Sequence, residues 1–277
     1  MNTFKSMNIF ITGASSGLGL AVAHEYAQRY VHTRVNLGLV GRDCERLLAL
    51  ENTLPKNGHL KTVKYVLDVR DATALQAAAE DFMAKFGTPN IVIANAGVSR
   101  GTLTELRDDI KAFQAIFDIN VMGMVHTFQP FIEPMKQAAK QGAEKNVVAQ
   151  LVGVASCAGI RGIPGSGAYS ASKSAVISYC ESLRAEMQHF NIHVSTIAPG
   201  YVRTPMTEQN QYNMPFLMDA DVFASKFVDA VDRKVRFKII PWQMDLIAKI
   251  MRFIPPCLWD RLMKNTPHKK RLDSDWM

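Results

Sequence analysis

Residues 7–30 decide the fold, and they read MNIFITGASSGLGLAVAHEYAQRY. The run 7–12 is apolar enough for a strand that is buried on both faces. It leads into TGASSGLG, a turn with three glycines, and then into a helix-length segment over 18–30. A strand, a glycine-rich turn and a helix form the first half of a βαβ unit, which predicts a parallel sheet.

The same alternation continues along the chain. Further strands are expected at 35–40, 62–69, 90–97, 146–156, 192–200 and 237–240, and helices at 43–54, 71–86, 108–140, 168–190 and 219–233. This order predicts an α/β fold with a doubly wound parallel sheet (a Rossmann fold), about seven strands and helices on both faces. No interdomain linker is visible. Residues 1–241 are therefore expected to form one nucleotide-binding domain that includes the catalytic site, with 242–277 as its amphipathic extension.

Composition limits the classes of protein. The 277 residues are 48% hydrophobic and carry a formal net charge of +7, with no long basic block and no nucleic-acid recognition motif. This mild basic excess fits an anionic cofactor or a membrane surface. The four cysteines and seven histidines are dispersed, which predicts a cytoplasmic protein with reduced thiols and no metal site. We see no signal peptide and no apolar run of about 18 residues, so no spanning helix is expected.

Ligands bind such a sheet at the carboxyl ends of its strands. After the first strand, Gly13, Gly17 and Gly19 allow a tight turn that lets a pyrophosphate reach the start of the next helix; a purely structural turn is the alternative. Other strand ends carry small or polar residues: Asp68, Asn95, Ala96, Gly97, Ser156, Pro199 and Gly200. Of these, Asp68 has a carboxylate that can accept a hydrogen bond from an adenine amino group.

Tyr169 and Lys173 stand four residues apart in GAYSASKSAVISY, residues 167–179. Side chains at this spacing share one face of a helix. A neighbouring ammonium group lowers the pKa of a phenol, so the pair is typical of a tyrosine that exchanges protons with a substrate. The alternative is two side chains that merely share a solvated helix face.

The motifs together, in their order, resemble the short-chain dehydrogenase/reductase family across residues 7–240. They are TGASSGLG, NAG, Asn120 in DINVMG, Ser156 in VASCAG, YSASK and PGYVRT. Ser156, Tyr169 and Lys173 also keep the family's Ser-x12-Tyr-x3-Lys spacing. The resemblance implies an enzyme that transfers a hydride between NAD(P) and a small-molecule carbonyl or secondary alcohol. A nicotinamide-binding regulator or scaffold without turnover is the rival hypothesis.

The resemblance also implies roles for the matching residues. Tyr169 is the acid in reduction and the base in oxidation, and Lys173 lowers its pKa and holds the nicotinamide ribose. Ser156 hydrogen-bonds the carbonyl oxygen, and Asn120 orders a helix bend and a water that links Lys173 to solvent; these four are the expected catalytic residues. Thr204 reaches the carboxamide. The expected cofactor-binding residues are Gly13, Ser15, Ser16, Gly17, Leu18, Gly19, Arg42, Asp68, Val69, Asn95, Ala96, Gly97, Tyr169, Lys173, Pro199, Gly200, Val202 and Thr204.

The choice between NAD and NADP depends mainly on Arg42. NAD-binding members usually end the second strand with an acidic residue that holds the ribose hydroxyls, but this chain reads LVGRD. The Arg42 guanidinium is suited to grip a 2′-phosphate, so NADP (NADPH) is the preferred cofactor and NAD remains possible. An ion pair with Asp43 is the alternative role for Arg42. Ser16 is a departure, because NADP-preferring members often have a basic residue there.

The segments after the last motif indicate the substrate and the partners. PMTEQNQYNMPFLM, residues 205–218, is apolar and favours a lipophilic ketone such as an acyl, sterol-like or long-chain carbonyl; packing of this lid onto the core is the alternative. Beyond it, an apolar stripe predicts a subunit interface or lid in a homodimer or homotetramer, a peripheral membrane contact, or packing on the same domain. The stripe comprises Leu246, Ile247, Ile250, Met251 and Ile254, and it continues with Leu258, Trp259, Leu262 and Met263.

Overall fold

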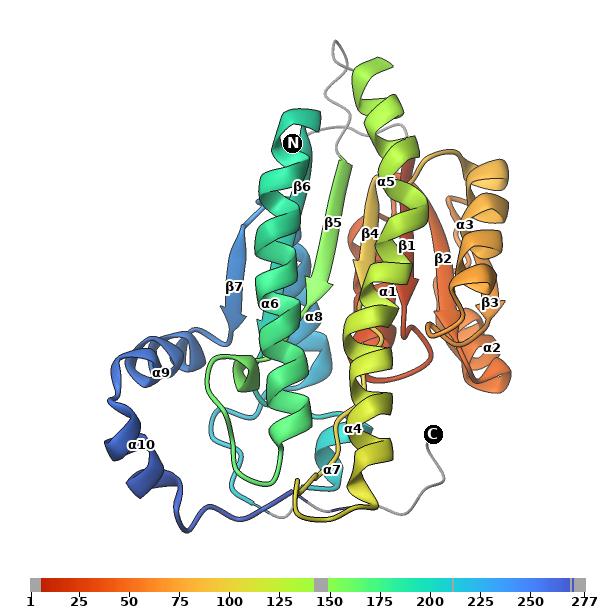
Figure 1. Ribbon diagram of the computed structural model, residues 1–277. Coiled ribbons are helices and arrows are strands. Elements are labelled where there is room, and N and C mark those ends of the chain that lie inside the picture. The colour runs from red at the N-terminus through yellow and green to blue at the C-terminus, as the bar shows by residue number, and fades with distance from the viewer. Residues whose placement is uncertain (1–5, 142–148, 211, 270, 272–277) are drawn as a thin grey trace.

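One sheet of seven parallel strands organises the molecule (Figure 1). The computed structural model describes residues 6–141, 149–210, 212–269 and 271. The strand order is β3-β2-β1-β4-β5-β6-β7, which confirms the predicted Rossmann fold. The strands are β1 (Ser6–Thr12), β2 (Arg34–Gly41), β3 (Leu60–Val66), β4 (Ile91–Ala94), β5 (Ala149–Val154), β6 (Ile192–Pro199) and β7 (Phe237–Ile240).

Helices cover both faces of this sheet, with α1, α2 and α8 on one face and α3, α5 and α6 on the other (Figure 1). Two short 3-10 helices, η2 (Cys157–Gly159) and η3 (Gln188–Phe190), follow β5 and α6. The α-helices are α1 (Gly17–Arg29), α2 (Cys44–Thr53), α3 (Ala72–Phe86), α4 (Asp109–Phe117), α5 (Gly123–Gln141), α6 (Gly167–Met187), α7 (Pro205–Glu208), α8 (Ala220–Asp232), α9 (Trp242–Phe253) and α10 (Pro256–Met263).

The continuous apolar strands are explained by this double covering. Ile9 and Ile11 of β1 pack in the core beneath α1 and α8, whereas Phe10 between them packs in the core beneath α3 and α5. All three side chains are fully buried. Successive side chains of a strand point to opposite faces, so a strand with two covered faces needs apolar residues at every position.

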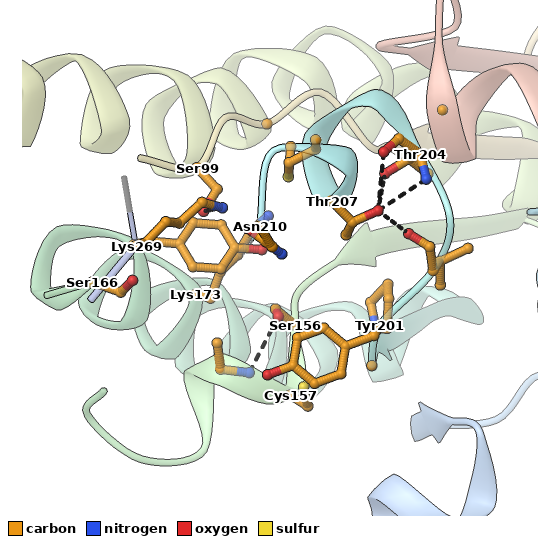
Figure 2. A pocket seen from close by; sticks show the side chains of 18 of the residues that line it. Ser99, Ser156, Cys157, Ser166, Lys173, Tyr201, Thr204, Thr207, Asn210 and Lys269 are labelled. Carbon is orange, nitrogen blue, oxygen red and sulfur yellow. Dashed lines mark hydrogen bonds between the residues drawn. The ribbon is translucent and has the colours of Figure 1, made fainter. Parts of the chain in front are cut away.

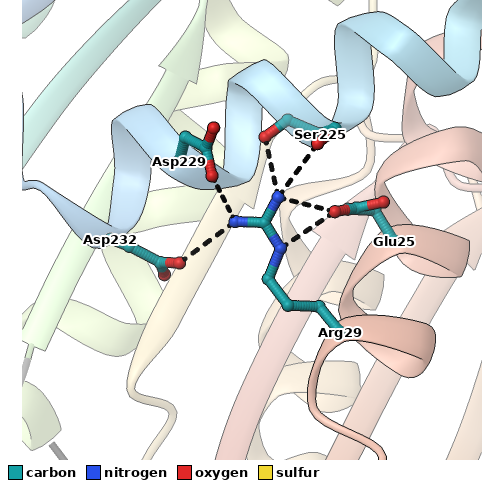
Figure 3. A network of polar contacts seen from close by, with 5 residues as sticks. All are labelled: Glu25, Arg29, Ser225, Asp229 and Asp232. Carbon is teal, nitrogen blue, oxygen red and sulfur yellow. Dashed lines mark hydrogen bonds and ion pairs between the residues drawn. The ribbon is translucent and has the colours of Figure 1, made fainter. Parts of the chain in front are cut away.

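One guanidinium group fixes α8 against α1 (Figure 3). Arg29 pairs with Glu25 one turn earlier in its own helix at 2.7 Å, and with Asp229 and Asp232 of α8 at 2.6 and 3.5 Å. It also donates to the carbonyl and the hydroxyl of Ser225, both at 3.1 Å. These contacts anchor the C-terminal end of α1, and the opposite end of that helix reaches the carboxyl edge of the sheet.

The structure departs from the expected elements in one helix and at the ends of two strands. The helix expected at 108–140 is interrupted by a π-helical turn, η1 (Asp118–Met122), between α4 and α5. The buried amide of Asn120 in this turn exchanges hydrogen bonds with the backbone of Val98, which ties the bend to the segment after β4. Strands β3 and β4 end at Val66 and Ala94, before Asp68 and before the NAG segment. Positions 146–148 of the expected fifth strand lie outside the described residues.

Helices α9 and α10 form the amphipathic extension. Met244 and Ala248 of α9 are buried in the core, so the buried face differs from the predicted stripe. The opposite face of α9 exposes the large apolar side chains of Trp242, Leu246, Ile250 and Phe253, and Phe253 is 87% exposed. Helix α10 adds two more, Leu258 and Leu262. Among the described residues, no helix has both the length and the apolar character to cross a membrane.

Candidate active site

A cavity of about 700 Å³ lies at the carboxyl ends of β1, β4, β5 and β6 (Figure 2). From β1 the chain runs outward through β2 and β3 and then returns to form β4 on the other side of β1. The direction of winding therefore reverses between β1 and β4. A crevice at this reversal point is the usual binding site of doubly wound sheets.

The glycine turn forms one wall of the cavity. Gly13 and Gly17 adopt left-handed φ values of +69° and +54°, which favour glycine. A Cβ atom at Gly19 would lie 2.2 Å from the carbonyl oxygen of Gly13, and one at Gly13 would lie 2.8 Å from the Cα of Ala96. No side chain fits at either position, and the first residues of α1, Gly17 and Leu18, line the cavity. This turn fits a pyrophosphate.

Asn95 joins the glycine turn to the end of β4. Its side-chain amide donates to the carbonyl oxygens of Thr12 and Gly13, both at 3.1 Å. A Cβ atom at Gly97 would lie 3.1 Å from the Asn120 side-chain oxygen and 3.3 Å from the Lys173 nitrogen. Glycine at position 97 therefore lets these polar groups approach the cavity floor closely.

Asn120 lies behind the cavity and is fully buried. Its amide nitrogen donates to the Val98 carbonyl at 3.0 Å and to the Ser172 hydroxyl at 2.9 Å, and its oxygen accepts from the Val98 N–H at 2.8 Å. The Ser172 hydroxyl in turn donates to the Tyr169 carbonyl at 2.8 Å. Asn120 thus holds the π-helical bend against the first turns of α6, the helix that carries Tyr169 and Lys173.

Ser156, Tyr169 and Lys173 converge on the cavity. Ser156 follows β5 and its hydroxyl caps η2 by accepting from the Ala158 N–H at 3.2 Å. Tyr169 and Lys173 occupy successive turns of α6, and the buried Lys173 ammonium donates to the Val154 carbonyl at 2.9 Å. The predicted constellation is therefore brought together by the end of one strand and the start of one helix.

Burial sets the pKa values of these two side chains. It raises the pKa of Tyr169 to about 12, against the smaller lowering effect of a hydrogen bond with Ser156. It lowers the pKa of Lys173 to about 8. The resemblance implies that Lys173 lowers the pKa of Tyr169. Among the protein's own groups the net shift in that pKa is upward instead, because burial is the largest effect. The Lys173 ammonium bonds to Val154 and lies 6.0 Å from the centre of the Tyr169 ring.

The segment after β6 closes the other side of the cavity. Thr204 begins α7, and its backbone N–H donates to the Thr207 hydroxyl at 3.0 Å. A Cβ atom at Gly17 would meet the Thr204 side chain at 3.5 Å, so α7 faces the glycine turn. Of the apolar residues predicted to cover the substrate, Met206 lines this cavity. Phe216, Leu217 and Met218 instead line a second hollow beside α8 and β7, so only the earlier part of the predicted segment 205–218 borders the cavity.

Arg42 and Asp68 lie at the neighbouring ends of β2 and β3. An Arg42 nitrogen lies 3.7 Å from the Asp68 carboxylate, and Arg70 pairs with the same carboxylate at 2.9 Å. Burial raises the pKa of Asp68, but the hydrogen bonds and charge of Arg70, aided by Arg42, leave it below its usual value. Asp43 caps α2 and pairs with Arg46 at 3.0 Å.

Most of the residues predicted for the site line the cavity: Gly13, Ser16, Gly17, Leu18, Asn95, Ala96, Gly97, Ser156, Tyr169, Lys173, Pro199, Gly200, Val202 and Thr204. The remaining ones lie in the same turn, behind the cavity, or at the ends of β2 and β3: Ser15, Gly19, Arg42, Asp68, Val69 and Asn120. Sequence reasoning missed Ser99, Tyr201, Tyr212 and Lys269, which also line it. Tyr201 stands inside the PGYVRT motif, whereas Lys269 was visible only as part of the basic run HKKR.

The site geometry agrees with the comparison of the sequence with protein families. A family model described as short chain dehydrogenase matches residues 7–214. The chain belongs to the short-chain dehydrogenase family. It is an oxidoreductase that uses a nicotinamide dinucleotide and acts on CH–OH groups.

Relatives and solved structures match from about three quarters to nearly the whole of this short-chain dehydrogenase. An uncharacterized oxidoreductase of Myxococcus xanthus (strain DK1622) is 35% identical over 90% of this chain and 93% of the relative. A 3-oxoacyl-(acyl-carrier-protein) reductase of Chlamydia trachomatis serovar D is 27% identical over 74% of this chain and 77% of the relative. A solved short chain dehydrogenase/reductase from Burkholderia phymatum, in complex with NAD, shares the fold. Its TM-score is 0.75, at 22% identity over 99% of this chain and 100% of the other.

Proposed function

We propose that this short-chain dehydrogenase interconverts a lipophilic ketone and its secondary alcohol, with NADP(H) as the preferred cofactor. The observation that carries the proposal is the convergence of Ser156, Tyr169 and Lys173 on the cavity that the glycine turn also lines. Hydride donation or acceptance is the chemistry that a nicotinamide dinucleotide would supply there.

The protein's own residues supply the proton and hold the substrate oxygen. In reduction, the Tyr169 hydroxyl donates its proton to the carbonyl oxygen, and in oxidation the phenolate takes a proton from the alcohol. A phenol holds its proton at neutral pH, and burial strengthens this for Tyr169 because it raises the pKa to about 12. The Ser156 hydroxyl donates a hydrogen bond to the same oxygen, where negative charge grows as the carbonyl is reduced.

Lys173 and Asn120 support Tyr169 from the other side. At neutral pH the Lys173 ammonium keeps its charge even though burial lowers its pKa to about 8. We assign it to hold the nicotinamide ribose, and Asn120 to hold the water that returns protons to Lys173 from solvent. The remaining contacts are assigned to the glycine turn for the pyrophosphate, to Asp68 for the adenine and to Thr204 for the carboxamide.

The preference for NADP rests on the end of β2. Gly41 ends the strand without a carboxylate, and the half-exposed Arg42 side chain follows directly. A Cβ atom at Gly41 would lie 2.9 Å from the Ser15 side chain, so the end of β2 lies against the glycine turn. A phosphate on the adenosine ribose would therefore meet the Arg42 guanidinium, which binds phosphate with charge-assisted hydrogen bonds.

The lipophilic substrate is supported by the apolar part of the cavity wall. Ile163, Tyr201, Met206 and Tyr212 line the same cavity as Tyr169 and Ser156. Methionine adapts to substrates of irregular shape, and the aromatic rings add apolar area. The related reductase from Chlamydia trachomatis is named for a 3-oxoacyl group, which is a ketone on an acyl chain.

We further propose that residues 242–277 extend the domain formed by 1–241, and that the protein is a cytoplasmic homodimer or homotetramer. Met244 and Ala248 support the first proposal, because they complete the same core as β7. The exposed apolar face of α9, which includes Ile250 and Phe253, supports the second, because a second copy would remove it from water. A peripheral membrane contact through this face is the alternative.

Turnover with a panel of ketones and alcohols tests the proposed function. The wild-type protein is expected to consume NADPH, followed by its absorbance, when long-chain ketones are present, and to do so faster than with NADH. A nicotinamide-binding regulator would bind both dinucleotides, as fluorescence titration reports, without turnover of any member of the panel. That result would overturn the proposal in favour of the regulator.

A further inference from the structure

The end of the described chain returns to the active-site cavity. After α10, Thr266, Pro267 and Lys269 line the cavity wall. The Arg271 guanidinium then binds both carboxylate oxygens of Asp109 at 3.0 and 3.1 Å. Asp109 is 4% exposed and stands at the start of α4. This ion pair therefore ties the segment after α10, here called the tail, to the body of the protein.

The loop between η2 and α6 holds α9 and α10 in place. The Arg161 guanidinium donates to the carbonyl oxygens of Met251 and Ile254 at 3.0 and 2.9 Å. The Trp259 indole N–H donates to the Gly162 carbonyl at 3.1 Å, and Arg161 lies 4.9 Å over the Trp259 ring. The tail is therefore fixed on one side through α9 and α10, which precede it, and on the other side through Arg271.

This attachment places the Lys269 ammonium inside the cavity. Its nitrogen donates to the Ser99 hydroxyl at 2.8 Å and lies 5.8 Å from the centre of the Tyr169 ring. The Ser99 hydroxyl is uncharged and satisfies one of the three N–H groups of the ammonium. Because Lys269 lines the cavity, its remaining donors can be reached by a ligand there.

The charges around Lys269 are unbalanced. Among the described residues that line the cavity, two are lysines, Lys173 and Lys269, and none is an aspartate or glutamate. The buried carboxylate of Asp109, which the same tail contacts, is bound by Arg271. Burial lowers the pKa of Lys269 to about 8, and no carboxylate offsets this effect. A partly buried ammonium without a counter-charge is unfavourable, and an anion beside it relieves the cost.

We propose that Lys269 binds an anionic group of the substrate, so that the substrates are apolar carbonyl compounds that carry a carboxylate or a similar acidic group. This inference rests on the proposed function, since it assigns one end of the substrate whose carbonyl meets Tyr169 and Ser156. Lys269 is then a specificity-determining residue, and its hydrogen bond to Ser99 orients the ammonium group toward the substrate.

The position of Lys269 separates this role from cofactor binding. Thr204 faces the glycine turn that fits the pyrophosphate. Figure 2 shows Lys269 and Ser99 together on one side of the cavity, with Thr204 and Thr207 on the opposite side. The ammonium therefore serves the substrate end of the cavity rather than the phosphates.

Keto acids and their methyl esters test the proposal. Straight-chain keto acids that differ in the distance between ketone and carboxylate are each paired with the ester, and kcat/KM is measured with NADPH. The wild type is expected to prefer the best acid over its ester by about 10-fold to 100-fold, the usual range for a hydrogen bond to a charged group. Lys269→Met is expected to bring the ratio of acid to ester kcat/KM to within about threefold of one, whereas Lys269→Arg keeps most of the preference for the acid.

Lys264→Met is the matched control, since Lys264 is an exposed lysine of the same tail, and it should keep the wild-type preference. Calorimetric titration of decanoate and decanol into the NADP-bound proteins adds a readout without turnover: decanoate binding should weaken in Lys269→Met alone. Ester turnover without any acid preference in the wild type, or a preference retained in Lys269→Met, overturns this inference and leaves the proposed function standing. If NADPH binds but no carbonyl is reduced, the proposed function itself fails.

Discussion

At the scale of single residues, burial controls three ionisable side chains in one cavity. It raises the pKa of Tyr169 to about 12 and lowers the pKa values of Lys173 and Lys269 to about 8, because each uncharged form is easier to bury. At neutral pH the phenol and both ammonium groups are therefore protonated. Sequence reasoning found Tyr169 and Lys173 because they stand four positions apart on one helix. It missed Lys269, whose position depends on the path of the tail.

Cofactor choice is also decided by one residue, Arg42. We expect Arg42→Ala to weaken NADPH binding about 10-fold to 100-fold and to leave NADH binding within about threefold. The reason is that a hydrogen bond to a charged group contributes about 1.5–3 kcal/mol, and each 1.4 kcal/mol is a factor of ten. Fluorescence titration of both dinucleotides into both proteins measures the ratio.

Arg46→Ala is the control for the loss of a positive charge near the end of β2. Arg46 is 63% exposed and pairs with Asp43, the residue that caps α2. Its replacement should leave the ratio of the two affinities unchanged. Equal affinities of the wild type for NADPH and NADH, or equal ratios in Arg42→Ala and the wild type, would remove Arg42 from cofactor selection.

At the scale of elements, the turn between β1 and α1 leaves no room for a side chain. Gly19→Ala should lower the free energy of unfolding by about 1–3 kcal/mol or more, as overpacking does, because its Cβ atom would lie 2.2 Å from a backbone oxygen. It should also weaken NADPH binding at least about tenfold, since relief of the contact must move the turn. Denaturant unfolding and dinucleotide titration measure the two effects.

Gly162→Ala controls for the loss of a glycine as such. A Cβ atom at position 162 would meet nothing within 4 Å. The expected change in unfolding free energy is within about 0.5 kcal/mol, as at ordinary surface positions, and NADPH affinity should not change. A Gly19→Ala protein that matches this control in both measurements would show that the turn is not needed for binding.

The elements show where a sequence pattern suffices and where it does not. Strands such as β1 are recognisable because burial on both faces demands apolar residues throughout. The bend at η1 was expected only from the family resemblance through Asn120 and not from the periodicity, since the apolar pattern continues through it and the cause is a tertiary contact from Asn120 to Val98. The ends of β3 and β4 were placed too late, because apolar residues continue beyond the last strand hydrogen bonds.

At the scale of the whole molecule, the extension presents an apolar surface on one side and completes the cavity on the other. The double variant Ile250→Ser/Phe253→Ser should shift the mass measured by light scattering from a dimer or tetramer to a monomer, because it removes two exposed apolar side chains from the proposed interface. Leu48→Ser, at an exposed apolar position of α2, should leave the mass unchanged.

Sedimentation with anionic vesicles distinguishes the alternative. If the wild type is a monomer that pellets with the vesicles in a salt-sensitive manner, and the double variant does not pellet, the face binds membranes rather than a second copy. An apolar stripe in a sequence predicts that such a face exists but not what covers it. The tail that carries Lys269 was equally hidden, because its docking depends on Arg161, Trp259 and the Arg271–Asp109 pair, which are distant in sequence.

The most direct test of the central claim is the turnover of Tyr169→Phe. Tyr169 is assigned as the proton donor, so the Phe variant should reduce ketones at least about 100-fold more slowly than the wild type, the usual contribution of a positioned acid. NADPH affinity should stay within about threefold, because only the hydroxyl is lost. A Phe variant that binds NADPH and reduces ketones at the wild-type rate would contradict the account.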